Sequence, residues 1–114
     1  ILMKNKILVV IGLGYVGLPI ALKFSKKIKT FGYDNNISRI GELKKGYDAN
    51  NEFKKKDIIE NKNLSFTFSE KIISNADYII VTVPTPINRY KKPDFNPLNS
   101  ACKSIGKNLK KNQL

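Results

Sequence analysis

The fold of this chain is decided by residues 6–17, which read Lys-Ile-Leu-Val-Val-Ile-Gly-Leu-Gly-Tyr-Val-Gly. The first half is an aliphatic run, the pattern of a strand that is buried on both faces of a parallel sheet. The second half carries glycine at positions 12, 14 and 17, and the apolar spacing that follows indicates a helix. We therefore predict a strand, a sharp glycine-rich turn and a helix.

Each glycine of the G-x-G-x-x-G motif has its own physical role. Gly12 permits the tight turn, Gly14 lets the backbone approach a pyrophosphate because it has no Cβ, and Gly17 allows the helix to lie close against the sheet. The N-terminus of the helix adds free N–H groups and a partial positive charge, which favour phosphate. Tyr15 and Val16 lie within the same motif, and we predict that they bind the cofactor together with the three glycines.

A carboxylate follows at the spacing that a dinucleotide site requires. Asp34 comes 20 residues after Gly14, at the end of a second expected strand, where it can accept hydrogen bonds from the ribose hydroxyls of an adenosine. Its charge would repel a 2′-phosphate, so the expected cofactor is NAD rather than NADP. Arg39 keeps the alternative open, because an arginine just after this strand can bind a 2′-phosphate. The alternative for Arg39 is that it is simply a helix residue near the adenosine. The alternative for Asp34 is that it is an unrelated surface carboxylate.

Strands and helices alternate along the chain. We predict strands at 6–11, 29–34, 64–68 and 77–83, the last of them buried, and helices at 15–27, 38–45, 53–60, 69–74 and 99–110. Gly46 closes the second helix and Pro84 ends the fourth strand. This order predicts an α/β fold of the Rossmann type, with a doubly wound, mostly parallel sheet. A complete domain of this type has about six strands and this chain about four, so we expect a truncated domain from a longer protein.

The fourth expected strand ends in Thr82-Val83-Pro84-Thr85-Pro86. This segment lies at the carboxyl edge of the sheet, where ligands of these folds bind. The prolines stiffen the chain, and the hydroxyl of Thr85 could bond the cofactor. The alternative is a rigid turn that contacts no ligand.

Composition narrows the classes of function. The chain has no histidine and a single cysteine, Cys102, so we predict no metal site, no disulfide and no histidine base. Its 21 basic and 9 acidic residues leave a formal charge of +12, which would attract polyanions. The lysine runs lack interleaved arginine or aromatic residues, so we interpret them as solvated surface rather than a nucleic-acid site. No apolar run approaches the ~20 residues of a membrane helix and no signal peptide is evident, which favours a cytoplasmic protein.

Three stretches carry a family resemblance. They are Ile-Gly-Leu-Gly-Tyr-Val-Gly-Leu-Pro at 11–19, Phe-Gly-Tyr-Asp at 31–34 followed by Arg39-Ile40, and Val-Pro-Thr-Pro-Ile-Asn at 83–88 followed by Tyr90-Lys91, Pro93-Asp94 and Pro97-Leu98. Together they resemble the UDP-glucose/GDP-mannose dehydrogenase family. Within it they look most like the UDP-N-acetylhexosamine 6-dehydrogenases of bacterial capsule, Vi-antigen and O-antigen synthesis. The resemblance spans almost the whole chain but only the first quarter of a typical member.

The resemblance implies an activity for the full-length protein. The sugar C6 alcohol of a UDP-sugar, UDP-GlcNAc or UDP-GalNAc, would be oxidised to the carboxylate by two NAD in succession, with a cysteine thiol carrying the intermediate. The resemblance makes Gly12, Gly14, Gly17, Asp34 and Thr85 NAD-contacting positions, with Arg39 a weaker candidate. It also implies a homodimer formed largely through a later helix.

The catalytic cysteine, lysine, asparagine and glutamate of the family lie beyond residue 114. We therefore expect residues 1–114 to be a partial N-terminal NAD-binding domain without catalytic residues, lacking the central helix and the UDP-binding domain. An excised cofactor domain or a truncated gene would both explain such a chain. Cys102 is not the family's catalytic cysteine, and its place near Ala101 and Ile105 in an expected helix predicts a packed, inert thiol.

Two rival functions stay open at this level. One is another NAD-dependent dehydrogenase with a similar start, such as a relative of hydroxyacyl-CoA or 6-phosphogluconate dehydrogenases, although the Pro-Thr-Pro-Ile-Asn stretch disfavours it. The other is a basic nucleic-acid-binding module on a Rossmann-like fold, favoured only by the charge.

Overall fold

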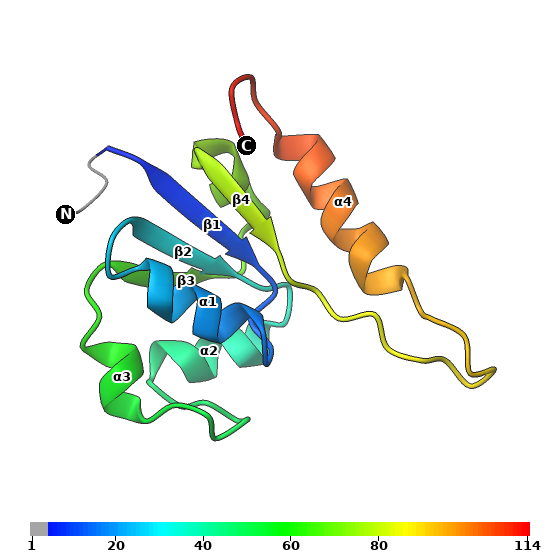
Figure 1. Ribbon diagram of the computed structural model, residues 1–114, viewed down its shortest axis with the longest axis horizontal. Helices are drawn as coiled ribbons and strands as arrows, with labels where there is room; N and C mark the ends of the chain where they lie inside the picture. Colours follow the sequence, from blue (N-terminus) through cyan, green and yellow to red (C-terminus); the bar gives the residue numbers. More distant parts are fainter. Residues whose placement is uncertain (1–4) are drawn as a thin grey trace.

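The structure is a computed structural model that describes residues 5–114. Strands and helices alternate as predicted (Figure 1). They are β1 (Ile7–Ile11), α1 (Gly17–Phe24), β2 (Lys29–Tyr33), α2 (Ile37–Lys44), α3 (Lys55–Ile59), β3 (Leu64–Thr67), the 3₁₀-helix η1 (Glu70–Asn75), β4 (Tyr78–Val81) and α4 (Asn96–Asn108).

The four strands form one parallel sheet in the order β3-β2-β1-β4. The central strand is β1, where Val9 pairs with Phe31 of β2 on one side and with Ile79 of β4 on the other. The strand order therefore reverses between β1 and β4. In open parallel sheets, ligands bind at the carboxyl ends of the strands beside such a reversal, so the topology places the expected site beyond Ile11.

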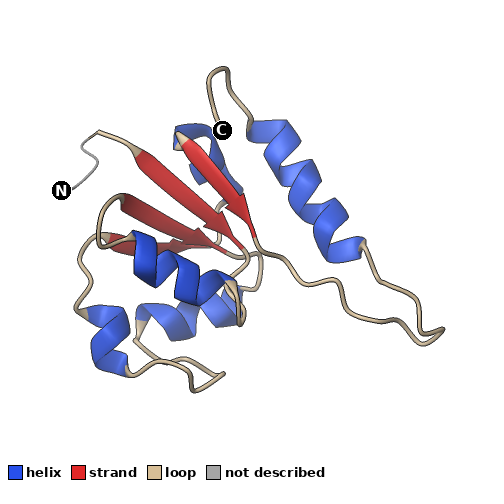
Figure 2. Ribbon diagram, viewed as in Figure 1, coloured by secondary structure: helices blue, strands red, loops and turns tan. Residues whose placement is uncertain are grey.

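The two faces of the sheet have separate cores, which confirms the doubly wound Rossmann-type fold. On one face Leu8 and Val10 pack with buried side chains of α1, α2 and α3, and on the other Val9 and Ile11 pack with Ile73 of η1 and with α4. This division follows from the alternation of side chains along a strand. Figure 2 shows the helices on both sides of the sheet.

Helix boundaries differ from the predictions by up to three residues, most clearly in α1 and α4. Helix α1 begins at Gly17 rather than at Tyr15, so Tyr15 and Val16 form the turn before it, and it ends at Phe24. Helix α4 begins at Asn96 instead of 99, with Pro97 in its first turn, where a proline costs no hydrogen bond. Gly46 ends α2 as predicted, with a φ of +82°.

The prediction that the fourth strand is buried was wrong. Strand β4 lies at the edge of the sheet, its residues are half-buried, and Val81 is 39% exposed. The physical reason is that only β1 pairs with it along its length among the described residues. Leu114 makes a single parallel contact on the open side, where its N–H donates to Asp77 O at 3.0 Å and its carbonyl accepts from Ile79 N at 2.6 Å.

Candidate functional site

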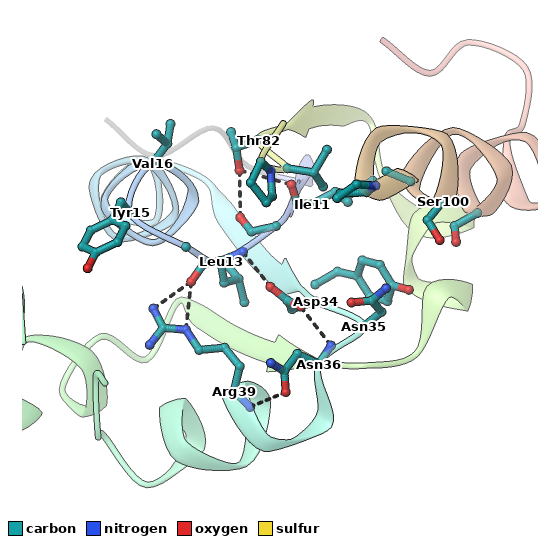
Figure 3. Close-up of a pocket in the computed structure, with 18 of the residues that line it drawn as sticks. Ile11, Leu13, Tyr15, Val16, Asp34, Asn35, Asn36, Arg39, Thr82 and Ser100 are labelled. Atoms are coloured by element: carbon teal, nitrogen blue, oxygen red, sulfur yellow. Dashed lines mark hydrogen bonds between the residues drawn. The ribbon is translucent and has the colours of Figure 1, made fainter. Parts of the chain in front are cut away.

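A cleft of about 840 Å³ opens at the carboxyl edge of the sheet. Its main walls are the glycine turn after β1, the end of β2 with residues 34–36, residues 82–84 after β4, and α4 as far as Ser104, and Arg39, residues 49–50 and Asp94 complete the lining. Figure 3 shows their side chains converging. The turn is the expected part, whereas the contribution of α4 through Ser100 and Ser104 has no signal in the sequence, because it depends on where the helix docks.

The three glycines are required for different reasons. Gly12 has a φ of +96°, and a Cβ there would lie 2.9 Å from the carbonyl oxygen of Thr82. A Cβ on Gly17 would collide with the carbonyl of Gly12. At Gly14 a Cβ would meet no protein atom within 4 Å, and this residue lines the cleft. The protein itself thus demands glycine at 12 and 17, while Gly14 leaves room for a ligand.

Free backbone donors border the cleft. Among the described residues, the N–H groups of Gly14, Tyr15, Val16 and Gly17 have no hydrogen-bond acceptor. They surround the N-terminus of α1, where the helix dipole adds a partial positive charge. Tyr15 and Val16 are 70% and 59% exposed, so no side chain within residues 5–114 covers them. The arrangement fits a phosphate or pyrophosphate group.

Asp34 lies beside this turn, as the sequence predicts. Its Oδ2 accepts the N–H of Leu13 at 2.9 Å, and its Oδ1 accepts the N–H of Asn36 at 2.9 Å. These bonds orient the carboxylate at the end of β2, on the wall of the cleft. Each oxygen retains a second lone pair, so the group can still accept the hydroxyls of a ribose.

The guanidinium of Arg39 makes hydrogen bonds within the protein that the sequence does not indicate. Its Nε and Nη2 donate to the carbonyl of Leu13 at 2.9 and 2.7 Å, and its Nη1 pairs with Asp48 at 2.9 Å (Figure 3 shows the bonds to Leu13). The side chain of Arg39 is 10% exposed. It is thus a residue of α2 tied to the glycine turn rather than a free cation beside the adenosine position.

Asp48 is a site residue that the sequence did not reveal, because it stands in a polar loop with several similar residues. Its side chain is fully buried. Burial opposes its ionisation, but the guanidinium of Arg39 and the N–H groups of Asn50, Glu52 and Phe53 outweigh that cost and hold the pKa of Asp48 below its ordinary value of 3.8. Asp48 is therefore a carboxylate at neutral pH.

Two threonines lie near the end of β4, and they differ in their surroundings. Thr85, the predicted cofactor contact, is exposed and is not among the residues that line the cleft. Thr82 lines it, and its hydroxyl donates to the carbonyls of Ile11 at 3.1 Å and Gly12 at 2.7 Å. Thr82 stands where a parallel strand reaches its carboxyl end, and this position was the signal that could have identified it.

Tyr33, at the end of β2, also lines the cleft. Burial raises the pKa of the Tyr33 hydroxyl at the cleft, an effect that a hydrogen bond with Ser104 counters and that the charges of Glu70 and Asp34 reinforce.

The prediction that Cys102 is packed was wrong. Its side chain is exposed while Ala101 faces the core, because successive helix positions point in different directions. Within residues 5–114, no three His, Cys, Asp or Glu side chains form a group that could hold a metal ion.

Fold and site together define a dinucleotide-binding domain of the Rossmann class. The comparison with protein families is more specific: residues 6–114 match the NAD binding domain of the UDP-glucose/GDP-mannose dehydrogenase family. The chain therefore belongs to this family, and NAD is the cofactor of the domain that it matches. The rival assignment to another NAD-dependent dehydrogenase group is thereby set aside.

Curated relatives and solved structures agree with this assignment. The chain is 46% identical to UDP-N-acetyl-D-glucosamine 6-dehydrogenase of Pseudomonas aeruginosa over 98% of its own length and 26% of that protein. It is also 46% identical to protein CapL of Staphylococcus aureus, over 90% of the chain and 24% of the relative. The structure of NDP-N-acetyl-D-galactosaminuronic acid dehydrogenase from Methanosarcina mazei Go1 matches 96% of the chain and 26% of that protein, with a TM-score of 0.82 at 27% identity. The chain thus spans about a quarter of these proteins.

Proposed function

We propose that this chain is the NAD-binding portion of a nucleotide-sugar 6-dehydrogenase. The full-length protein would oxidise the C6 alcohol of UDP-GlcNAc or UDP-GalNAc to the uronate with two NAD, for the synthesis of a surface polysaccharide such as a capsule or O-antigen. The relatives from P. aeruginosa and Salmonella typhi, each 46% identical, are both UDP-N-acetyl-D-glucosamine 6-dehydrogenases. The observation that carries the proposal is the row of unpaired N–H groups from Gly14 to Gly17 beside Asp34.

The residues of this chain would bind and orient the cofactor. The N–H groups of Tyr15 and Val16 would donate to the pyrophosphate, Gly14 would let it approach, and Asp34 would accept the adenosine ribose hydroxyls. Bound NAD would supply the hydride acceptor, one molecule for each of the two oxidation steps. The hydroxyl of Thr85 stays a predicted cofactor contact. Thr85 lies on an exposed loop outside the cleft, so the cofactor would have to extend beyond the cleft to reach it.

We propose that the catalytic cysteine, lysine, asparagine and glutamate belong to the part of the protein that follows this domain, together with the central helix and the UDP-binding domain. The chain would then be inactive alone. The relatives support this proposal, because the chain spans only about a quarter of their length. We also propose a homodimer for the full-length protein and a cytoplasmic location, where NAD and UDP-sugars occur. Among the described residues, no helix is long and apolar enough to cross a membrane.

Calorimetric titration of the purified chain with NAD, NADP, UDP-GlcNAc and duplex DNA tests the proposal. We expect binding of NAD, binding of NADP that is weaker by at least about tenfold because Asp34 repels the 2′-phosphate, and no binding of the UDP-sugar. A chain that binds duplex DNA with steep salt dependence and does not bind NAD would contradict the proposal and support the nucleic-acid alternative.

A further inference from the structure

The peptide units on both sides of Leu13 are held by residues far away in the chain. The N–H of Leu13 donates to Asp34, 21 residues away, and its carbonyl accepts two bonds from Arg39, 26 residues away. The carbonyl of Leu13 and the N–H of Gly14 belong to one planar trans peptide and point in opposite directions. By holding the carbonyl, Arg39 therefore fixes the direction of the first unpaired N–H group of the turn.

The position of Arg39 depends in turn on Asp48. The two side chains pair at 2.9 Å, with the arginine 10% exposed and the carboxylate fully buried. The loop folds around Asp48, whose oxygens also accept the N–H groups of Asn50, Glu52 and Phe53 at 3.0 to 3.2 Å. Every buried side-chain polar atom among the described residues has a partner. Arg39 and Asp48 are thus joined by one charge-assisted hydrogen bond, and the other bonds of each side chain go to backbone groups.

The pairing of Arg39 with Asp48 also restricts the positions that the guanidinium of Arg39 can reach. Arg39 lines the cleft beside Asp34, and an arginine near this position is the usual partner of a 2′-phosphate in NADP-binding relatives of the fold. Three of its five N–H donors are used within the protein. A guanidinium tied to Leu13 and Asp48 cannot turn toward a phosphate on the ribose without breaking these bonds.

We propose that Asp48 is a positioning residue for the cofactor site. Through Arg39 it holds the glycine turn in the shape that binds pyrophosphate, and it withholds the guanidinium from a 2′-phosphate, which favours NAD over NADP. This inference rests on the proposed function, because it assumes that the pyrophosphate binds at residues 14–17. Asp48 itself touches no cofactor atom in this scheme and acts only through Arg39.

The test is the affinity of the chain for NAD and for NADP in Asp48→Asn, in Arg39→Gln and in the double variant. We expect Asp48→Asn to weaken NAD binding about tenfold, the effect of losing a charge-assisted hydrogen bond, and to reduce the ratio of NAD to NADP affinity. In the Arg39→Gln background the same change should alter NAD affinity by less than about twofold, because the residue through which Asp48 acts is gone. A purely structural role of Asp48 would not make the effect of Asp48→Asn depend on Arg39, and it would not change the ratio of NAD to NADP affinity.

Asp57→Asn is the matched control. Its carboxylate also accepts a backbone N–H, that of Lys54 at the start of α3, but no hydrogen bond or salt bridge joins it to Arg39 among the described residues. We expect wild-type NAD affinity and cofactor ratio for this variant. If Asp48→Asn does not fold, Arg39→Lys serves instead, since an ammonium keeps the charge beside Asp48 but loses the forked contact with Leu13. It should weaken NAD binding by a similar factor.

Three results would overturn the inference. One is wild-type NAD affinity and cofactor ratio in Asp48→Asn or, if that variant does not fold, in Arg39→Lys. Another is an undiminished effect of Asp48→Asn in the Arg39→Gln background. In both cases the wild-type chain still binds NAD, and the proposed function stands. A wild-type chain that binds no NAD removes the proposed function and this inference with it, so the two failures are distinguishable.

Discussion

The glycine turn at 12–17 and the loop at 84–95 border the same cleft, but they are held in different ways. The turn is fixed by residues from three other parts of the chain, Thr82, Asp34 and Arg39. The hydrogen bonds of the loop are local, such as Asn88 N to Lys92 O at 2.8 Å and Asp94 N to Pro86 O at 2.6 Å. Figure 1 shows this loop projecting away from the sheet between β4 and α4.

This difference indicates that the side of the cleft formed by the glycine turn has its shape before a ligand binds. The turn has its backbone geometry set by buried or half-buried partners, so it can present N–H groups without rearranging. The loop carries apolar side chains in solvent, among them Ile87 at 72% and Tyr90 at 67% exposure, and its shape does not depend on the core. Substitutions at the turn positions that pack against the protein, Gly12 and Gly17, should therefore affect the whole domain, and substitutions in the loop should not.

Gly17→Ala should have the largest effect on stability. The new Cβ would overlap the carbonyl of Gly12 and come within 2.5 Å of the Thr82 hydroxyl, so α1 would have to move away from the sheet. We expect a loss of roughly 3 kcal/mol or more in the free energy of unfolding, the range of severe overpacking. Urea denaturation followed by circular dichroism measures it. A loss below about 1 kcal/mol would show that the turn is less rigid than the comparison requires.

Gly14→Ala separates binding from folding within the same turn. Its Cβ would meet no protein atom within 4 Å, so we expect the free energy of unfolding to change by less than about 1 kcal/mol, the ordinary helix-region difference between glycine and alanine. NAD affinity should fall by about tenfold or more, because the methyl group occupies space that the pyrophosphate needs. Calorimetric titration of a folded variant is the measurement, and unchanged affinity would contradict the assigned ligand position.

Acid should weaken the turn side of the cleft through Asp48. Its folded-state pKa lies below the ordinary value of 3.8, so ionised Asp48 stabilises the fold above that value and loses this contribution as the pH falls through the lower folded pKa. The difference in unfolding free energy between wild type and Asp48→Asn should be constant from pH 7 to about 5 and shrink below about 4. Urea denaturation at several pH values tests this. A difference that stays constant to pH 3 would show that the carboxylate is not stabilised by its partners.

Thr82→Val and Thr85→Val compare the two regions with the same substitution at positions three residues apart. Thr82→Val removes the hydroxyl that binds the carbonyls of Ile11 and Gly12 and should cost about 1 kcal/mol, the net value of a typical intramolecular hydrogen bond. Thr85 makes no such bond among the described residues and is exposed, so its substitution should leave thermal stability unchanged. Equal shifts in melting temperature would remove the distinction between turn and loop.

Much of the fold could be predicted from the sequence, since β1, β2, β3 and α2 lie where the pattern placed them. The predictions of burial were wrong where the packing of a neighbouring element, and not the local sequence, decides how exposed a residue is. Strand β4 has the composition of a buried strand but lies at an edge, and Cys102 has apolar neighbours in sequence but faces solvent. At the candidate site the glycines and Asp34 were predictable, Thr82 was missed although its place at the end of a parallel strand was a signal, and Asp48 had no signal.

The sequence by itself determined the class of fold, the glycine turn and the carboxylate that follows β2. These features depend on short-range properties: the absence of Cβ atoms at set positions, the alternation of apolar residues, and a fixed spacing between a turn and the end of the next strand. Only the tertiary structure decided that Arg39 is tied to Leu13 and Asp48, that Thr82 rather than Thr85 braces the turn, and that α4 completes the cleft. Those outcomes join residues from separate elements, and the packing of helices on the sheet selects the partners.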